Sequence, residues 1–443
     1  MKNELILLCV LFPFFLFAQP SSQKEVTAEL IDLHEVTGDD ENFEGYERLK
    51  EKIGEAEIVM LGEQSHGDAT TFQTKIKLIK YLHQEMGFEI LAFESSLYEC
   101  DRAWSMMQQG HDAKDAFAKG LNPMWSTLEE FNPLFEYVGQ QMVQDPLMIA
   151  GFDSQLTGKI GVDYFAKDLT AYIASFADVT PYQKDIEKLQ AFINTTRALE
   201  KVKKKKATQY MTCAQRLIDL VESNPNSERS SFWRQTLTGL KVFVSDHSLG
   251  TDDRDQKMAE NLTWLKEKYP GKKIICWGAT SHFLYNSSTV QMEEERIRKA
   301  LGDYYLTHSM MGDYVKEKYG DAVYTIGFIA HEGSFGAFGM STLAQPKTNS
   351  LEYLIGKSPN DNYFLPLQNL SLQNYVSRPL GHQYMTNDIA KVMDAVVFNR
   401  YMRKPYTDWD YLLYLVPENN MGPKRLAKMK KALEERKKRE KVQ

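Results

Sequence analysis

Short apolar runs rich in isoleucine, valine and phenylalanine alternate along the chain with longer segments of helical spacing. The segment after the first run places Phe72, Ile76, Ile79 and Leu82 on one helical face, and Gly87 ends it. The apolar runs predict buried strands over residues 57–62, 88–94, 147–153, 273–279 and 323–330, with later candidates near Tyr363 and Ala395. Because a helix joins the first two strands, these strands are predicted to run parallel.

Between residues 164 and 269 the chain shows only helical patterns. We therefore expect an α/β fold, with a mostly parallel sheet, flanking helices and a large helical insertion at about residues 160–270. Residues 424–443 predict a basic C-terminal helix, because they hold 10 Lys and Arg against 3 Glu. Residues 19–423 are expected to form the domain that carries the site.

The N-terminal segment has the pattern of a secretory signal peptide. Residues 5–17 are uninterrupted apolar residues, too short a run to span a bilayer as a helix, and Ala18 is a small residue suited to cleavage. We expect residues 1–18 to be removed and the protein to be exported, to the periplasm or the extracellular space, with no stable membrane insertion after cleavage. An uncleaved N-terminal anchor is the alternative.

Composition and charge narrow the class of partner. The chain has 443 residues, 43% of them hydrophobic, which suits a folded protein with a sizeable core. Its net charge is -7 although the C-terminal segment is basic, so the body is acidic and a nucleic-acid partner is not expected. Cys100, Cys213 and Cys276 are far apart and predict neither a disulfide framework nor a metal site.

Polar side chains that can carry chemistry follow several predicted strands. Glu63 and His66 come after the first strand, Glu94 and Asp153 end the next two, and His282 follows the fourth. Parallel α/β sheets form their sites beyond the carboxyl ends of the strands, so these groups are expected to gather at one edge. Four of the five have a structural alternative: a helix cap for Glu63 and His66, a loop cap for Asp153 and a satisfied buried histidine for His282.

Two further observations narrow the set of site residues and the kind of mechanism. His331 and Glu332 follow the fifth strand, but Gly333 and Gly336 make that stretch more typical of a surface hairpin. The chain has no G-x-S-x-G, H-E-x-x-H, P-loop or G-x-G-x-x-G motif. A covalent serine mechanism is therefore not indicated, and histidine with carboxylates favours a site that activates water.

The same residues resemble the erythromycin esterase family. That family has G-E-x-[ST]-H near the first strand and A-F-E after the next helix. This chain has corresponding segments in the same order between Glu57 and Gly336: GEQSH at 62–66, AFE at 92–94, GFD at 151–153, RDQKMAENL at 254–262 and WGATSH at 277–282. The resemblance implies hydrolysis of a macrolide lactone by activated water, without a serine nucleophile. No cofactor is expected.

Carried over by position, the resemblance makes His66 the general base. It implies that Glu63 and Glu94 orient the base and the water, and that His282 matches the last histidine of the family's H-N-x-H segment. Asp153 is expected to bind the substrate.

Two positions depart from the family pattern. Ala279 replaces the first histidine of the H-N-x-H segment, and Lys75 replaces an arginine nine residues after His66. Lys75 is also expected to bind the substrate. It keeps the positive charge but cannot form the two parallel hydrogen bonds of a guanidinium. The expected substrate is thus a small-molecule ester or lactone other than erythromycin itself.

Two other functions fit the same residues. Glu63, His66, Glu94, Asp153 and His282 could together ligate a divalent ion in a metal-dependent hydrolase. Alternatively, the protein could be a non-catalytic relative that binds a small molecule in the same cleft.

Overall fold

The computed structural model describes residues 22–197, 202–225, 228–301, 304–336, 339–409, 412 and 423–440. Nine strands of this part of the chain form one sheet: β1 Ile31–Asp32, β2 Ile58–Glu63, β3 Phe88–Ser96, β4 Met148–Asp153, β5 Lys273–Ala279, β6 Val323–Phe335, β7 Ser341–Thr342, β8 Asn362–Pro366 and β11 Ala395–Met402. A separate two-stranded hairpin contains β9 Ser377–Leu380 and β10 Gln383–Met385. The predicted signal peptide lies outside the described residues.

The centre of the sheet is parallel, as the sequence predicts. The strand order is β1-β8-β11-β6-β2-β5-β3-β4, and all pairs from β11 to β4 are parallel. β8 runs antiparallel to β11 and to β1, and β7 runs antiparallel to β6. The strand at β5, which comes late in the chain, is inserted between β2 and β3. The carboxyl ends of β2, β5, β3 and β4 are therefore neighbours at one edge.

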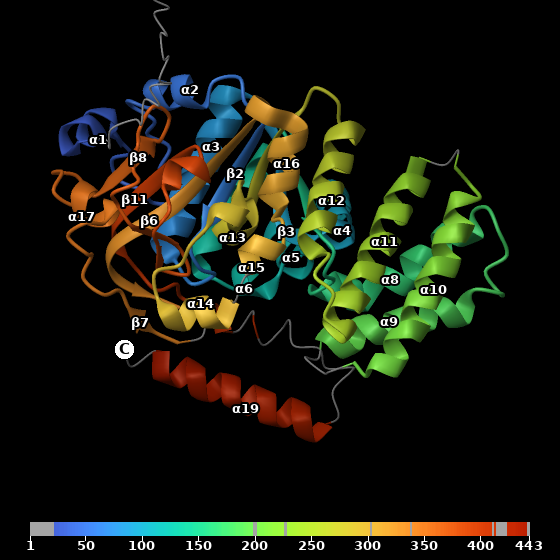
Figure 1. Cartoon of the computed structure of the whole chain (residues 1–443). Coiled ribbons are helices and arrows are strands. Elements are labelled where there is room, and N and C mark those ends of the chain that lie inside the picture. The colour runs from blue at the N-terminus through green and yellow to red at the C-terminus, as the bar shows by residue number, and fades with distance from the viewer. Residues whose placement is uncertain are drawn as a thin grey trace, which may run out of the picture.

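Helices surround the sheet and form the insertion (Figure 1). Before the insertion the helices are α1 Gln23–Glu29, α2 Glu47–Ile53, α3 Ala69–Met86, α4 Leu97–Gln108, α5 Ala113–Gly120, α6 Pro123–Ser126 and α7 Asn132–Gln141. The insertion contains α8 Lys159–Ala174, α9 Gln183–Arg197, α10 Lys204–Glu222, α11 Glu228–Leu249 and α12 Arg254–Lys268. The later helices are α13 Thr280–Phe283, α14 Glu295–Leu301, α15 Tyr304–Thr307, α16 Met311–Tyr319, α17 Leu351–Ile355 and α19 Pro423–Glu440.

The insertion has a clear place in the fold. α8 to α11 stand together beside the sheet, on the right of Figure 1, and α12 returns the chain to it. The amide of Asn261 on α12 donates to the carbonyl of Phe152 at 2.9 Å, which docks this helix against β4. No described helix has the length and apolar character needed to cross a membrane.

Local structure agrees with the sequence patterns. The predicted apolar face of α3 is buried, and Gly87 ends the helix with φ 69°, a conformation that suits glycine. Cys100, Cys213 and Cys276 are all free and buried. His331 and Glu332 continue β6, and the hairpin with β7 begins two residues later, at Ser334.

A close backbone approach shapes the edge that carries the site. β3 shifts register against β4 between Phe93 and Ser96, and this irregular end lies directly over Gly151. A Cβ atom at Gly151 would stand 2.4 Å from the carbonyl oxygen of Ser95 and 2.5 Å from that of Ser96. Only glycine therefore lets the end of β3, which carries Glu94, pack on β4 in this way.

Replacing Gly151 with alanine should reduce the free energy of unfolding by about 1–3 kcal/mol, because the added methyl group overpacks rigid backbone. Urea denaturation measures the change. The control is Gly239→Ala in α11, where the nearest atoms to the new Cβ are 3.6 Å away. Alanine is the better helix former, so that variant should be as stable as the natural protein or more so. Equal effects of the two changes would contradict this account of the strand contact.

Candidate active site

Four neighbouring strand ends supply the framework of the site. Glu63, the last residue of β2, is in register with Ala279, the last residue of β5. Glu94 lies two residues before the end of β3, and Asp153 ends β4. The sheet thus brings three predicted site residues to one edge, with the end of β5 between Glu63 and Glu94.

His66 is held by Glu63 across a short loop. Its Nδ1 atom lies 3.0 Å from the Oε1 atom of Glu63, and its side chain is 29% exposed while that of Glu63 is fully buried. Because an ionised carboxylate only accepts hydrogen bonds, the proton of a neutral His66 ring belongs on Nδ1. Among the residues that the structure describes, none is hydrogen-bonded to Nε2 of His66. That nitrogen is free to accept a proton.

Lys75 balances the buried charge of Glu63. Its ammonium group forms an ion pair with Oε2 of Glu63 and donates to the carbonyl of Gly278 at 3.3 Å. It also lies 3.9 Å from the ring centroid of Trp277, and its side chain has no exposed surface. Burial lowers the pKa of Lys75 to about 8, against the opposing attraction of Glu63. All of these contacts are internal to the protein.

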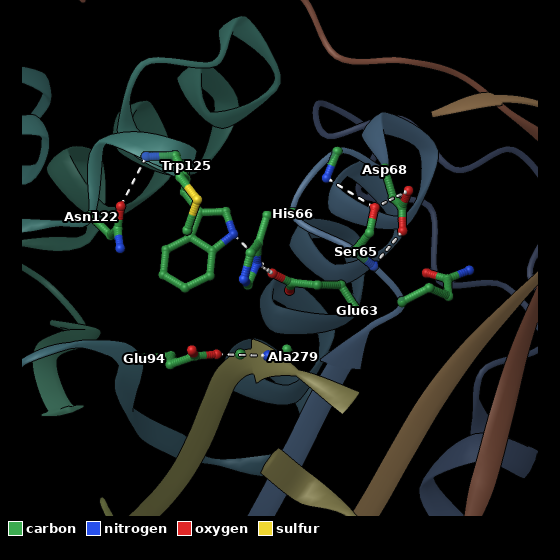
Figure 2. A network of polar contacts seen from close by, with 12 residues as sticks. Glu63, Ser65, His66, Asp68, Glu94, Asn122, Trp125 and Ala279 are labelled. Carbon is green, nitrogen blue, oxygen red and sulfur yellow. Dashed lines mark hydrogen bonds and ion pairs between the residues drawn. The ribbon is translucent and has the colours of Figure 1, made fainter. Parts of the chain in front are cut away.

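Trp125 is a third partner of Glu63. Its indole Nε1 donates to Oε1 of Glu63 at 2.8 Å, and its ring meets that of His66 edge-on with 5.1 Å between centroids. In Figure 2 the indole and the imidazole lie side by side against the Glu63 carboxylate. Oε1 therefore accepts from two side chains.

Arg254 joins Glu94 to Asp153. Its guanidinium donates to Oε1 of Glu94 at 2.8 Å and to both oxygens of Asp153, at 3.1 and 2.7 Å. The other oxygen of Glu94 accepts from the backbone N–H of Ala279 at 2.9 Å. Both carboxylates are almost fully buried, so the arginine compensates charges that would otherwise be costly.

His282 forms a second histidine–carboxylate pair. Its Nδ1 atom lies 2.8 Å from Oδ1 of Asp255, which also accepts from the backbone N–H of Met311. Its Nε2 atom is 3.4 Å from Oε1 of Glu94 and 3.4 Å from Nη1 of Arg254. Arg254 and Asp255 both belong to the first turn of α12, so one helix end aligns this half of the site.

Opposing effects set the pKa values of the site. Burial disfavours the charged form of both histidines, but neighbouring carboxylates outweigh it. The pKa of His66 is raised by its hydrogen bond to Glu63 and by the charge of Glu94, and that of His282 is raised by Asp255 and Glu94. Burial likewise raises the pKa of Glu94, but His282 and Arg254 overcome it and lower the value to about 2.

The loop that carries His66 is fixed from the far end of the chain. Asp68 accepts from the backbone N–H and the hydroxyl of Ser65, at 2.8 and 2.9 Å, instead of capping α3 with its side chain. Asp68 also lies 3.0 Å from Nε2 of His382, a contact between residues 314 positions apart. The backbone N–H of Gly381 donates to the carbonyl of Gln64. The site loop is therefore packed between β2 and the β9–β10 hairpin.

The structure brings the predicted residues together and adds others. Glu63 and His66 form one cluster with Lys75, and Glu94, Asp153 and His282 form the other. The sequence motifs pointed to the segment that holds Arg254 and Asp255 but gave neither residue a role. Nothing in the sequence pattern pointed to Trp125 or His382.

The metal-dependent alternative requires the histidine and carboxylate side chains of the site to be arranged as metal ligands. In the described part of the chain, no three or more histidine, cysteine, aspartate or glutamate side chains are arranged so that they could hold a metal ion. The carboxylates of the two clusters are directed at Lys75 and Arg254, and the histidines are directed at carboxylates. The charged side chains of both clusters are therefore engaged with one another in ion pairs and hydrogen bonds.

Comparisons with known proteins identify the family of the chain. A family model described as Erythromycin esterase matches residues 83–414. A protein of Bacillus subtilis (strain 168) named "Putative hydrolase YbfO" is 26% identical over 368 residues, covering 75% of this chain and 79% of that protein. The Erythromycin esterase type II of Escherichia coli is 22% identical over 404 residues, covering 81% and 92%.

Solved structures share the fold. The crystal structure of a succinoglycan biosynthesis protein superposes with a TM-score of 0.69 at 19% identity, covering 87% of this chain and 97% of that one. A mutant of the erythromycin esterase EreC in its open conformation superposes with a TM-score of 0.59 at 16% identity, covering 83% and 96%. Since the family model spans well over half of the chain, this protein belongs to the erythromycin esterase family.

Proposed function

We propose that this protein is a hydrolase that opens a lactone or another carboxylic ester with a water molecule activated by His66. The observation that carries the proposal is the state of the His66 ring. Its Nδ1 is hydrogen-bonded to a fully buried carboxylate, while the side chain reaches solvent and no described residue is hydrogen-bonded to its Nε2. This is the arrangement that a general base requires, because the bound nitrogen fixes the tautomer and the free nitrogen takes the proton.

The reaction follows from the two histidine–carboxylate pairs. Nε2 of His66 takes a proton from water as the water oxygen bonds to the ester carbonyl carbon, and Glu63 stabilises the resulting imidazolium. Glu94 accepts a hydrogen bond from the attacking water and directs it. When the tetrahedral intermediate collapses, the carbon–oxygen ester bond breaks. His282, whose charged form Asp255 and Glu94 favour, supplies the proton that the leaving alkoxide needs.

Lys75 and Arg254 act in this scheme through the carboxylates. We propose that Lys75 holds Glu63 in its ionised form and affects the substrate through that contact, since its side chain is fully buried. Arg254 keeps Glu94 and Asp153 ionised and fixed in place. Asp153 then affects substrate binding by orienting Arg254, which is 23% exposed.

The substrate of the Escherichia coli relative is erythromycin by its name, and the departures at Lys75 and Ala279 favour a different ester or lactone here. We also propose that the mature protein is exported.

Substituting His66 with asparagine should reduce hydrolysis by about 100-fold or more while the protein stays folded, because a general base typically contributes 10²–10⁴-fold. Mass spectrometry of a panel of macrolides, simple lactones and aryl esters detects the product by the gain of one water. The matched control is His111→Asn, a change at an exposed histidine outside the site, which should leave activity unchanged. Full activity of the folded His66 variant would exclude His66 as the base. Binding of a panel compound without turnover by the natural protein would favour the non-catalytic alternative.

The pH dependence of kcat/KM should show an acid limb that reports His66. Only the neutral imidazole accepts a proton, so activity is lost as pH falls through the pKa of His66. Glu63 and Glu94 raise that pKa, which places the half-point above the ordinary histidine value of about 6.5. Steady-state kinetics from pH 5 to 8 measures the limb. A profile that stays flat over this range would contradict a histidine base.

Removing the guanidinium of Arg254 should destabilise the protein and the site together. Arg254→Met leaves Glu94 and Asp153 without their counter-charge, and such changes cost about 3–5 kcal/mol. The depressed pKa of Glu94, about 2, gives the natural protein stability that is present above about pH 4.5 and is lost as pH falls towards 2. Urea denaturation at pH 7 and pH 4 should show a smaller difference between the two proteins at the lower pH, since the freed carboxylates of the variant take up protons there. A difference that does not change with pH would contradict the ion-pair account.

A further inference from the structure

Trp125 has a place in the site that no sequence motif marks. It lies in α6, a helix of four residues whose start is fixed by Asn122: the side-chain oxygen of Asn122 accepts from the N–H of Met124 at 3.1 Å. The backbone N–H of Asn122 donates in turn to the hydroxyl of Ser95 at 3.1 Å, in the strand that carries Glu94. Pro123 occupies the first turn. The indole is thus held by the same sheet edge that holds the two carboxylates.

The indole of Trp125 contacts both members of the Glu63–His66 pair. The indole is 1% exposed, and its one hydrogen-bond donor is 2.8 Å from Oε1 of Glu63, the same oxygen that faces Nδ1 of His66. The ring also covers one side of the imidazole, edge-on at 5.1 Å (Figure 2). A buried tryptophan needs a partner for its N–H, but a backbone carbonyl would serve. Here the partner is the carboxylate that orients the proposed base.

We propose that Trp125 is a positioning residue that weakens His66 as a base and holds it in place, by sharing the Glu63 oxygen and by covering the imidazole. The catalytic part of this inference rests on the proposed function, whereas the effect on the imidazole itself does not. Trp125 is itself almost fully buried, so we do not expect it to bind the substrate.

The direction of the effect follows from the geometry. The indole N–H withdraws part of the negative charge of Oε1, so this oxygen stabilises the imidazolium form of His66 less than an unshared carboxylate oxygen would. The indole also keeps water from one side of the ring, which again disfavours the charged form. Both effects lower the pKa of His66, so removing the indole N–H should raise it.

Other charged groups face His66 and stay in place in the experiment. Glu94 on β3 and Glu63 on β2 favour the imidazolium, and His282 on α13 opposes it. Lys75 on α3 acts on the other oxygen of Glu63. In the part of the chain that the structure describes, only Glu63 of these four side chains is hydrogen-bonded to Trp125, so a change at Trp125 alters one contact of the set.

The test is an NMR titration of the full-length protein with ¹³C-labelled histidine rings. The signal of His66 is assigned from its loss in the His66→Asn variant. In Trp125→Phe, which keeps an aromatic ring but lacks the N–H, the titration midpoint of His66 should rise by about 0.5–1 pH unit, the equivalent of one ordinary hydrogen bond. The matched control is Trp233→Phe, a buried tryptophan whose ring contacts lie within the helical insertion and α4. It should leave the midpoint unchanged.

A second measurement covers the case in which Trp125→Phe does not fold. Growth with 5-fluorotryptophan makes the indole N–H a stronger donor without any mutation, so the His66 midpoint should then fall. A rise with phenylalanine, or a fall with fluorotryptophan, supports the inference. An unchanged midpoint in the folded variant, or an unchanged midpoint in the fluorinated protein where the variant does not fold, overturns it.

Kinetics on a hydrolysed aryl ester separates this inference from the proposed function. In Trp125→Phe the acid limb should move to higher pH, and kcat on the plateau should fall about 3- to 10-fold with KM unchanged, because a hydrogen bond that positions the base is lost. A lower kcat with an unmoved acid limb would mean that Trp125 is only structural. If the natural protein hydrolyses no ester, the proposed function fails, but the NMR result still decides whether Trp125 tunes His66.

Discussion

The buried carboxylate of Glu63 is the group on which the rest of the site depends. It has no exposed surface, yet it meets three side chains from three different elements: Lys75 of α3, Trp125 of α6 and His66 of the loop after β2. A charge in such a place is unfavourable by several kcal/mol unless it is paired and hydrogen-bonded. The three partners satisfy it, and in doing so they fix one another. The orientation of His66 is therefore a consequence of how a buried charge is accommodated.

The same principle organises the other half of the site. Arg254 forms ion pairs with Glu94 and Asp153, as Lys75 does with Glu63. Each cation allows its carboxylates to remain ionised away from water. The end of β5 lies between the two halves and contacts both, since the carbonyl of Gly278 accepts from Lys75 and the N–H of Ala279 donates to Glu94. The end of β5 thus connects the two charge networks.

The sequence predicts the half of this arrangement that depends on the direction of the strands. Parallel strands bring their carboxyl ends to one edge, so Glu63, Glu94 and Asp153 could be placed from apolar runs and the residues that end them. The seven predicted strands are all present. The helical insertion is also present, because long helices have a periodicity that can be recognised without knowing their partners.

The remaining partners could not be predicted, for reasons that are physical. Trp125 lies in a helix too short to have a periodic pattern, and its role depends on one indole N–H that reaches across the loop. Arg254 and Asp255 have the composition of any helix start exposed to water, and only the docking of α12 turns them inward. Asp68 and His382 meet across 314 residues. Lys75 has helical spacing that places it on the apolar face with Phe72 and Ile79, but nothing local shows that its ammonium group pairs with Glu63.

The tautomer of His66 shows most directly whether Glu63 orients this ring as a base. In ¹⁵N NMR of the histidine rings, long-range couplings from the carbon-bound protons show which ring nitrogen carries the proton. Above the titration midpoint of His66, the account predicts a neutral ring protonated on Nδ1, with the proton shared with Glu63 and an unprotonated Nε2. The Glu63→Gln variant should lose this preference. A neutral ring protonated on Nε2 in the natural protein would contradict the account, because that nitrogen could not then take a proton from water.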